Sequence, residues 1–156
     1  MNKTWLKGCL FSIAALVSAT ATAYEDIHSI RIFQTNNQFV LPDARLPTSV
    51  TVRVYEVDTH KRASAEITRQ VRARLSDDIK PGNHETANRK AFSDLLNSPD
   101  WMPIYQQIEA GGQAIDAAVR FQIEKVPAIV FNDRQVVYGQ RSLQAAIEVY
   151  NKEERR

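Results

Sequence analysis

Cysteine is almost absent from this sequence. Its 156 residues contain one, Cys9, which lies in an N-terminal stretch that we expect the cell to remove. The mature protein then has no thiol, which excludes disulfides, cysteine-ligated metals and cysteine-based redox catalysis. Glycine and histidine are also scarce, with five and three residues, and the sequence has neither a glycine-rich phosphate loop nor histidines at metal-ligand spacing. We therefore expect no cofactor, no metal and no catalytic constellation.

Acidic side chains are missing from residues 1–23, which have the pattern of a secretory signal peptide. Lys3 and Lys7 precede an apolar run over residues 9–17, and Ala21-Thr22-Ala23 supplies the small-residue pattern that signal peptidase reads. The run is short for a membrane span, so an uncleaved anchor is the less favoured alternative. We predict cleavage between Ala23 and Tyr24 and location in the periplasm.

Removal of the signal peptide changes the charge balance. Of the 20 Lys and Arg residues, 18 remain, against 18 Asp and Glu, so the formal net charge falls from +2 to zero. A neutral chain lacks the basic excess that nucleic acid or an anionic membrane attracts. We therefore expect no direct contact with nucleic acid and no transmembrane segment after cleavage.

Four segments of the mature chain have the pattern of strands. Apolar residues alternate over residues 27–34, and valines at 50, 52 and 54 alternate with Thr51 and Arg53, which is typical of a half-buried strand. Two short apolar segments, 128–131 and 135–138, flank Asn132-Asp133-Arg134, a turn suited to an antiparallel hairpin.

The segments between these strands have helical spacing. Ser64 is expected to cap a first helix, Pro81-Gly82 to interrupt the chain, and residues 87–96 to form a second helix. A third helical pattern runs over residues 101–119. Within it, Gly111-Gly112 predicts a kink or two shorter helices with close packing, because two glycines cost roughly 2 kcal/mol relative to alanine.

The C-terminal segment predicts one more helix. Ser142 is expected to cap it, and its buried face is formed by residues at helical spacing, namely Leu143, Ala146, Ile147 and Tyr150. Residues 151–156 are predicted to be a polar, frayed tail that follows a single domain over residues 24–150. The whole order predicts an α/β fold with a mixed sheet of about four strands flanked by helices.

The C-terminal pattern resembles that of a known superfamily. A helix, residues 121–131, a hairpin and a last helix look like the second half of a thioredoxin-like three-layer sandwich. In that superfamily the residue at the position of Pro127 is a cis-proline beside the active site, and the backbone of its predecessor, here Val126, pairs with bound peptide. Thioredoxin-like enzymes carry Cys-x-x-Cys after the first strand, where this chain has Thr35-Asn36-Asn37-Gln38. The resemblance therefore implies the fold without the redox activity.

A closer resemblance rests on residues 125–139. Their pattern is Lys-x-Pro-Ala-x-Val-Phe-x-Asp-x-x-Val-Val-Tyr-Gly, and Val54-Tyr55-Glu56-Val57-Asp58 lies earlier in the chain. With the signal peptide, these features resemble a family of secreted proteins of integrating conjugative elements, mobile DNA segments that encode a type IV secretion system. Type-F conjugative pilin-assembly proteins share the thioredoxin-like outline. The secreted family of integrating conjugative elements tends to have glycine where Gln122 stands, so we expect a different or strained helix cap there.

The resemblance implies a function in conjugative transfer. We interpret the protein as a non-catalytic periplasmic component that assists the type IV secretion apparatus by binding other envelope proteins. Val126, Pro127 and Tyr138 are the candidate partner-binding residues, although Pro127 could equally be a purely structural proline at the start of a strand. The alternative function is a thiol-independent periplasmic chaperone or isomerase of envelope proteins, and an unrelated secreted domain is a third interpretation.

Overall fold

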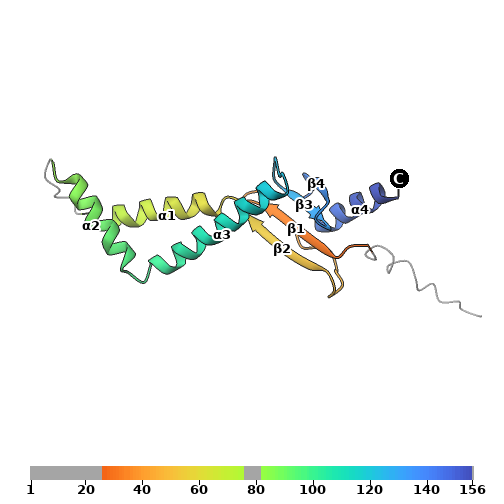
Figure 1. Cartoon of the computed structure of the whole chain (residues 1–156), viewed down its shortest axis with the longest axis horizontal. Coiled ribbons are helices and arrows are strands. Elements are labelled where there is room, and N and C mark those ends of the chain that lie inside the picture. The colour runs from red at the N-terminus through yellow and green to blue at the C-terminus, as the bar shows by residue number, and fades with distance from the viewer. Residues whose placement is uncertain (1–25, 76–81, 156) are drawn as a thin grey trace, which may run out of the picture.

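A computed structural model of the protein describes residues 26–75 and 82–155. The predicted signal peptide, with Cys9 and the cleavage point between Ala23 and Tyr24, lies outside these residues, as does Pro81 of the predicted chain break. The elements follow one another as β1 (Ser29–Gln34), β2 (Thr51–Glu56), α1 (Thr59–Ala73), α2 (His84–Leu96), α3 (Trp101–Arg120), β3 (Ala128–Phe131), β4 (Gln135–Tyr138) and α4 (Leu143–Glu154). Figure 1 shows a sheet at one end of the molecule and three helices that extend away from it.

The strands form one mixed sheet in the order β2-β1-β3-β4. β1 pairs with β2 in parallel and with β3 antiparallel, and β3 and β4 form an antiparallel hairpin. This is the predicted mixed α/β arrangement, and at this level it agrees with a thioredoxin-like sandwich. Asn132 and Asp133 close the hairpin with φ values of 52° and 58°. Asn and Asp tolerate this left-handed region better than most residues, so the predicted turn forms here.

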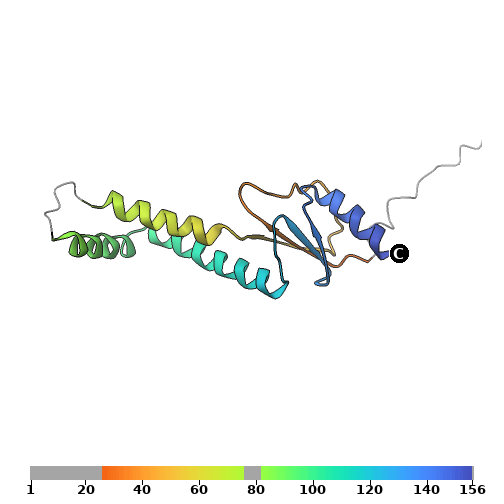
Figure 2. The ribbon, with the colours of Figure 1, turned by 90° about the horizontal axis from the view of Figure 1, so that it is seen from above.

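Each face of the sheet carries one apolar cluster. Because side chains alternate along a strand, Ile30 and Ile32 of β1 point to one face and Phe33 to the other. The first face packs against α4, with Ile147 and Tyr150 in the same cluster. The second packs against the C-terminal part of α3. Figure 2 shows these two helices on opposite sides of the sheet.

No helix lies between β1 and β2, a stretch that the structure describes in full. A loop runs from β1 to β2, and Val40, Ala44 and Leu46 of this loop pack into the α4-side cluster. The loop therefore supplies apolar cover where an amphipathic helix would otherwise be needed. It is tied to α4 by hydrogen bonds in which the Leu41 N–H donates to the Arg141 carbonyl and the Leu143 N–H to the Leu41 carbonyl.

The prediction of a half-buried second strand is wrong. Val52 and Val54 do share a face, but 41% and 54% of their surface is exposed. They lie in register with Ile30 and Ile32 of β1, on the α4 side. β2 stands at the border of the sheet, so the apolar cover that buries the β1 residues does not extend over these valines.

α1 and α3 form an antiparallel helical extension. His60, near the start of α1, lies against Gly111 in the second half of α3, and Arg74, at the end of α1, contacts Asp100 before α3 begins. The predicted interruption at Gly111-Gly112 is wrong, because α3 is one helix of 20 residues. The predicted close packing is confirmed: a Cβ on Gly111 would lie 2.6 Å from the backbone nitrogen of His60.

Two predicted helix ends also need correction. α1 begins at Thr59, five residues before the predicted Ser64 cap, and the Ser64 hydroxyl instead donates to the His60 carbonyl. α4 continues to Glu154, so most of the predicted frayed tail is helical. The Ser142 cap is confirmed, since its hydroxyl accepts a hydrogen bond from the Ala145 N–H at 3.0 Å. Among the described helices, none has both the length and the apolar character needed to cross a membrane.

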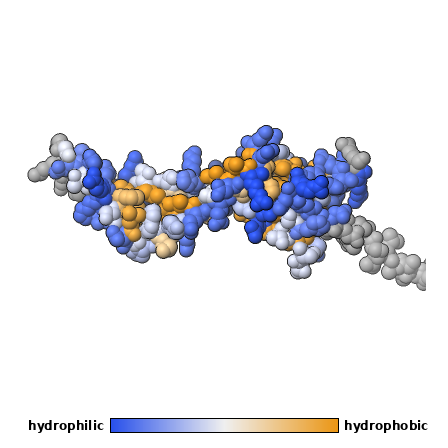
Figure 3. All heavy atoms as spheres, in the orientation of Figure 1, coloured by the Kyte–Doolittle hydropathy of each residue, from blue (hydrophilic) through white to orange (hydrophobic). Residues whose placement is uncertain are grey.

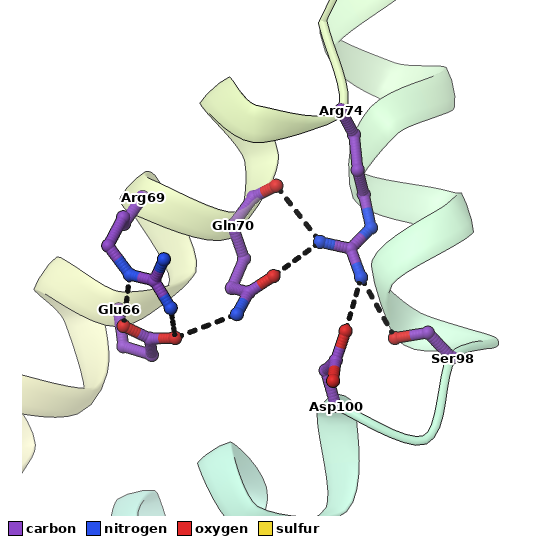
Figure 4. A network of polar contacts seen from close by, with 6 residues as sticks. All are labelled: Glu66, Arg69, Gln70, Arg74, Ser98 and Asp100. Atoms are coloured by element: carbon purple, nitrogen blue, oxygen red, sulfur yellow. Dashed lines mark hydrogen bonds and ion pairs between the residues drawn. The ribbon is translucent and has the colours of Figure 1, made fainter.

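A polar network fastens the far end of α1 to the loop before α3 (Figure 4). The Arg74 guanidinium donates to the Gln70 side chain, to the Ser98 hydroxyl and, at 2.7 Å, to Asp100. Gln70 in turn donates to Glu66, which also accepts from Arg69. Hydrogen bonds lower the pKa of Glu66 to about 2, with the larger effect from Arg69 and the smaller from Gln70. The network is built from charge-assisted hydrogen bonds, which are stronger than neutral ones.

Candidate functional site

The chain reaches the predicted site through a tight helix end after α3. Gln122 adopts φ 52°, its N–H donates to the Val119 carbonyl, and the Ile123 N–H donates to the Ala118 carbonyl at 2.9 Å. These bonds define a Schellman motif with Gln122 at the left-handed position, where glycine is usual. The expectation of a strained cap at Gln122 is confirmed.

The three predicted binding residues lie together at the end of the β3–β4 hairpin. The Val126–Pro127 peptide bond is cis. Pro127 is buried, whereas Val126 and Tyr138 are half-buried and pack on the α3-side cluster. The Gly139 N–H donates to the Pro127 carbonyl at 2.9 Å, which holds the end of β4 against the proline. The Lys125 ammonium lies 5.2 Å from the centre of the Tyr138 ring.

Val126 differs from Pro127 in its backbone hydrogen bonding. Within the described part of the chain, no hydrogen bond involves the N–H or the C=O of Val126. A half-buried residue with free backbone groups can pair with an extended segment of another chain. The backbone of Val126 is therefore available for recognition.

The turn Thr35–Gln38 directly follows β1, which pairs with β3 up to Ala128, the residue after the proline. Phe33 pairs with Ala128, so the antiparallel register continues from Gln34 toward Pro127 and from Thr35 toward Val126. Two backbone hydrogen bonds between Thr35 and Gln38 close the turn. A redox-active cysteine pair depends on the thiols and on a helix N-terminus that lowers their pKa. This turn has no thiol and leads into a loop, so both requirements are unmet here.

Asp58 connects this turn to α1, which sequence reasoning did not predict. Its Oδ2 accepts a hydrogen bond from the Asn36 N–H at 3.3 Å. Its Oδ1 is buried without a hydrogen bond within the described structure and lies 3.9 Å from the Arg62 guanidinium. A carboxylate held in this way fixes the turn relative to the start of α1.

The hairpin turn is also fastened to β1. The Arg31 guanidinium donates two hydrogen bonds to Asp133, at 2.5 and 2.9 Å, and one to the Tyr55 hydroxyl. The hydrogen bonds from Arg31 lower the pKa of Asp133, and the same bonds raise the pKa of Arg31. This bidentate pair neutralises Arg31 and holds β1, β2 and the hairpin turn in one arrangement.

An open groove of about 930 Å³ lies between the border strand β2 and α3. Sequence reasoning missed it, because its walls come from segments that are far apart in the chain. It is lined by Arg53, Val54, Tyr55, Glu56, Thr59, Arg62, Pro103, Gln106, Gln107, Ala110 and Gln113. Glu56 and Arg62 form an ion pair inside it. The described residues contain no group of three or more His, Cys, Asp or Glu that could hold a metal ion.

The sheet order and the helix on each face define an α/β protein of thioredoxin-like outline without a redox centre in the described residues. Residues 35–156 match the family model described as "Protein of unknown function (DUF1525)", and the chain belongs to that family. No curated protein matches the sequence, and no solved structure matches the fold.

Proposed function

We propose that this protein is a non-catalytic binding component of an integrating conjugative element. It assists the assembly or function of the type IV secretion apparatus in the periplasm by contacting other envelope proteins. The observation that carries the proposal is the cis Val126–Pro127 bond directly before Ala128, the β3 residue that pairs with Phe33 near the end of β1. The cis-proline that the resemblance associates with peptide recognition supports the proposal, while Thr35-Asn36-Asn37-Gln38 lacks the thiols of a redox enzyme.

Recognition at this edge would use three kinds of contact. The free N–H and C=O of Val126 would pair with the backbone of a partner segment. The half-buried Val126 and Tyr138 side chains offer apolar contact area, and aromatic side chains often dominate the energy of an interface. Pro127 is buried, so it would shape this surface without contributing much contact area itself.

A mating experiment tests the proposal. A donor strain from which the gene has been deleted should transfer the element less often, and the wild-type gene should restore transfer. A Val126→Asp/Tyr138→Ala double variant should be present at wild-type level in the donor and fail to restore transfer. A matched control, Met102→Asp/Tyr105→Ala on α3, should restore it. Unreduced transfer by the deletion strain would refute the role in conjugation.

A second candidate, a thiol-independent chaperone, is favoured by a separate observation. Large apolar side chains are exposed along α2 and α3 (Figure 3), and they include Phe92, Leu96, Met102, Tyr105, Ile115 and Val119. Exposed apolar area of this kind can hold unfolded chains. If this is the function, purified protein should suppress aggregation of a denatured, cysteine-free substrate. A Val119→Asp variant should then be weaker than a Val54→Asp control, and no suppression by wild-type protein would dismiss this candidate.

A further inference from the structure

β2 has a free edge along its whole length in the described structure. It is the outermost strand of the order β2-β1-β3-β4, and it is six residues long against four for the other border strand, β4. An unpaired edge presents a row of N–H and C=O groups that can pair with another strand. The edge of β2 is therefore the longest stretch of open sheet edge in the described structure.

The hydrogen bonds to β1 show which groups of β2 face outward. The Thr51 N–H donates to the His28 carbonyl, and the Val57 N–H donates to the Gln34 carbonyl. In a parallel pair, alternate residues of a strand bond to the same neighbour. The odd-numbered residues of β2 are thus bonded to β1, and the backbone groups of Val52, Val54 and Glu56 point toward the open side.

The side chains of β2 divide between two environments. Val52 and Val54 are exposed on the α4 side, as described above. Arg53 lies on the α3 side, lines the groove, and within the described part of the chain makes no hydrogen bond or ion pair. Its neighbour in register, Arg31, is neutralised by Asp133. Arg53 therefore places an uncompensated positive charge at the middle of the open edge, between two exposed valines.

The wall of α3 suits a peptide beside this edge. It presents the side-chain amides of Gln106, Gln107 and Gln113, with Ala110 and Pro103 between them. Amide groups can donate and accept, so they can satisfy a peptide in more than one register. A strand added at the usual spacing of about 4.8 Å from β2 would turn alternate side chains toward this wall.

We propose that the open edge of β2 binds an extended segment of another protein as a fifth strand. The segment carries an acidic residue opposite Arg53, turned toward the groove, and β-branched apolar residues on either side of it that pack beside Val52 and Val54. A second copy of this chain fits less well, because antiparallel pairing of two β2 strands centred on Arg53 would set two guanidinium groups opposite each other. The site is separate from the Val126 edge, so it can be tested with purified protein and does not depend on the mating experiment.

Edge protection is the competing explanation. A charged side chain on a border strand often serves to prevent strand addition. In that case Arg53 would repel every added strand, and its removal would promote self-association. The two explanations therefore predict opposite results for an acidic peptide and for Arg53 variants.

Two labelled, blocked peptides provide the test: Thr-Val-Glu-Val-Thr-Val and the same sequence with lysine in place of glutamate. Fluorescence anisotropy with the full mature protein at low salt should show tighter binding of the acidic peptide. Arg53→Glu should weaken that binding and favour the lysine peptide. The ratio of the two dissociation constants should change by about five- to thirtyfold, as expected for a cross-strand charge pair. Equal binding of both peptides, or binding of neither, would overturn the proposal. Self-association of Arg53→Ala without loss of peptide binding would also overturn it.

Backbone pairing has its own test. Val54→Pro removes an outward N–H while leaving the bonds to β1 intact, and proline is tolerated on an edge strand in that position. This variant should keep the circular dichroism spectrum of the wild type and lose peptide binding by about tenfold or more. As a check that leaves the protein unchanged, the peptide can be N-methylated on either alternate set of backbone nitrogens. One set should abolish binding and the other should not; equal effects of both sets would contradict strand addition.

Discussion

Gly111 of α3 lies against the backbone of His60 of α1, so closely that a Cβ at this position would stand 2.6 Å from the His60 nitrogen. Its neighbour Gly112 has nothing within 4 Å of the same point. Both residues occupy the interior of one helix, so alanine improves the helix propensity equally at each by about 1 kcal/mol. The space available for the added methyl group is the difference between them.

We predict opposite effects for these two substitutions. Gly112→Ala should raise the free energy of unfolding by about 1 kcal/mol. Gly111→Ala should lower it by roughly 1–3 kcal/mol, because the contacted atoms are backbone and the helices must separate to relieve the overlap. Urea denaturation measured by circular dichroism gives both values. Equal effects of the two substitutions would mean that α1 and α3 do not approach each other at Gly111.

Gln122 offers a stabilising substitution. A non-glycine residue in the left-handed region costs about 1–2 kcal/mol relative to the right-handed region, and glycine avoids this cost. We predict that Gln122→Gly raises the free energy of unfolding by about 1 kcal/mol, whereas Gln122→Ala does not raise it. Thermal unfolding of the three proteins tests this, and a lower melting temperature for Gln122→Gly would count against the left-handed cap.

Two serines distinguish a true helix cap from a hydroxyl within a helix. Ser142 accepts a hydrogen bond from the Ala145 N–H, whereas Ser64 lies inside α1 and donates to the His60 carbonyl. Ser142→Ala should therefore cost about 1 kcal/mol, the usual value for loss of a cap. Ser64→Ala should be neutral or slightly stabilising, because alanine is the better helix former. A larger loss at Ser64 than at Ser142 would reverse this assignment.

Acid should destabilise the helical extension through Glu66. Its pKa is about 2 in the folded protein, against an ordinary value of 4.5, because the carboxylate accepts hydrogen bonds from Arg69 and Gln70. Between these values the unfolded chain binds a proton that the folded protein does not, so stability is present above pH 4.5 and is lost as the pH falls toward 2. Melting temperatures over this range should fall less steeply for Glu66→Gln than for the wild type. Parallel curves would show that Glu66 does not contribute.

Much of the fold was predictable because local patterns decide it. Residues close together in the sequence decide three kinds of element: the alternating strands β1 and β2, the apolar stripe of α4 and the Asn132-Asp133 turn. Long-range packing decided the cases in which prediction failed. The close approach of His60 allows Gly111 to remain within a continuous helix, and the position of β2 at the sheet border leaves Val52 exposed. Neither relationship is visible in the sequence around these residues.

The candidate site was predictable only in part, for the same reason. Pro127 is conspicuous in the sequence because proline is unusual at the start of an apolar strand. The contact of Asp58 with Asn36 carries no such signal, since it joins residues 22 positions apart. The groove beside β2 combines a strand with a helix that starts more than forty residues later in the chain. Arg53 therefore looked like the polar member of an alternating strand until its surroundings were known.

Photocrosslinking at Tyr138 tests most directly whether this protein acts by binding at the proline edge. A photoreactive phenylalanine analogue would replace Tyr138 in a donor strain that carries the element, and the same analogue at Met102, an exposed residue of α3, would serve as the control. We predict a discrete crosslinked product with another envelope protein of the transfer system from position 138, absent at position 102 and absent in cells that lack the element. No product from position 138, in a strain that still transfers the element, would contradict binding at this edge.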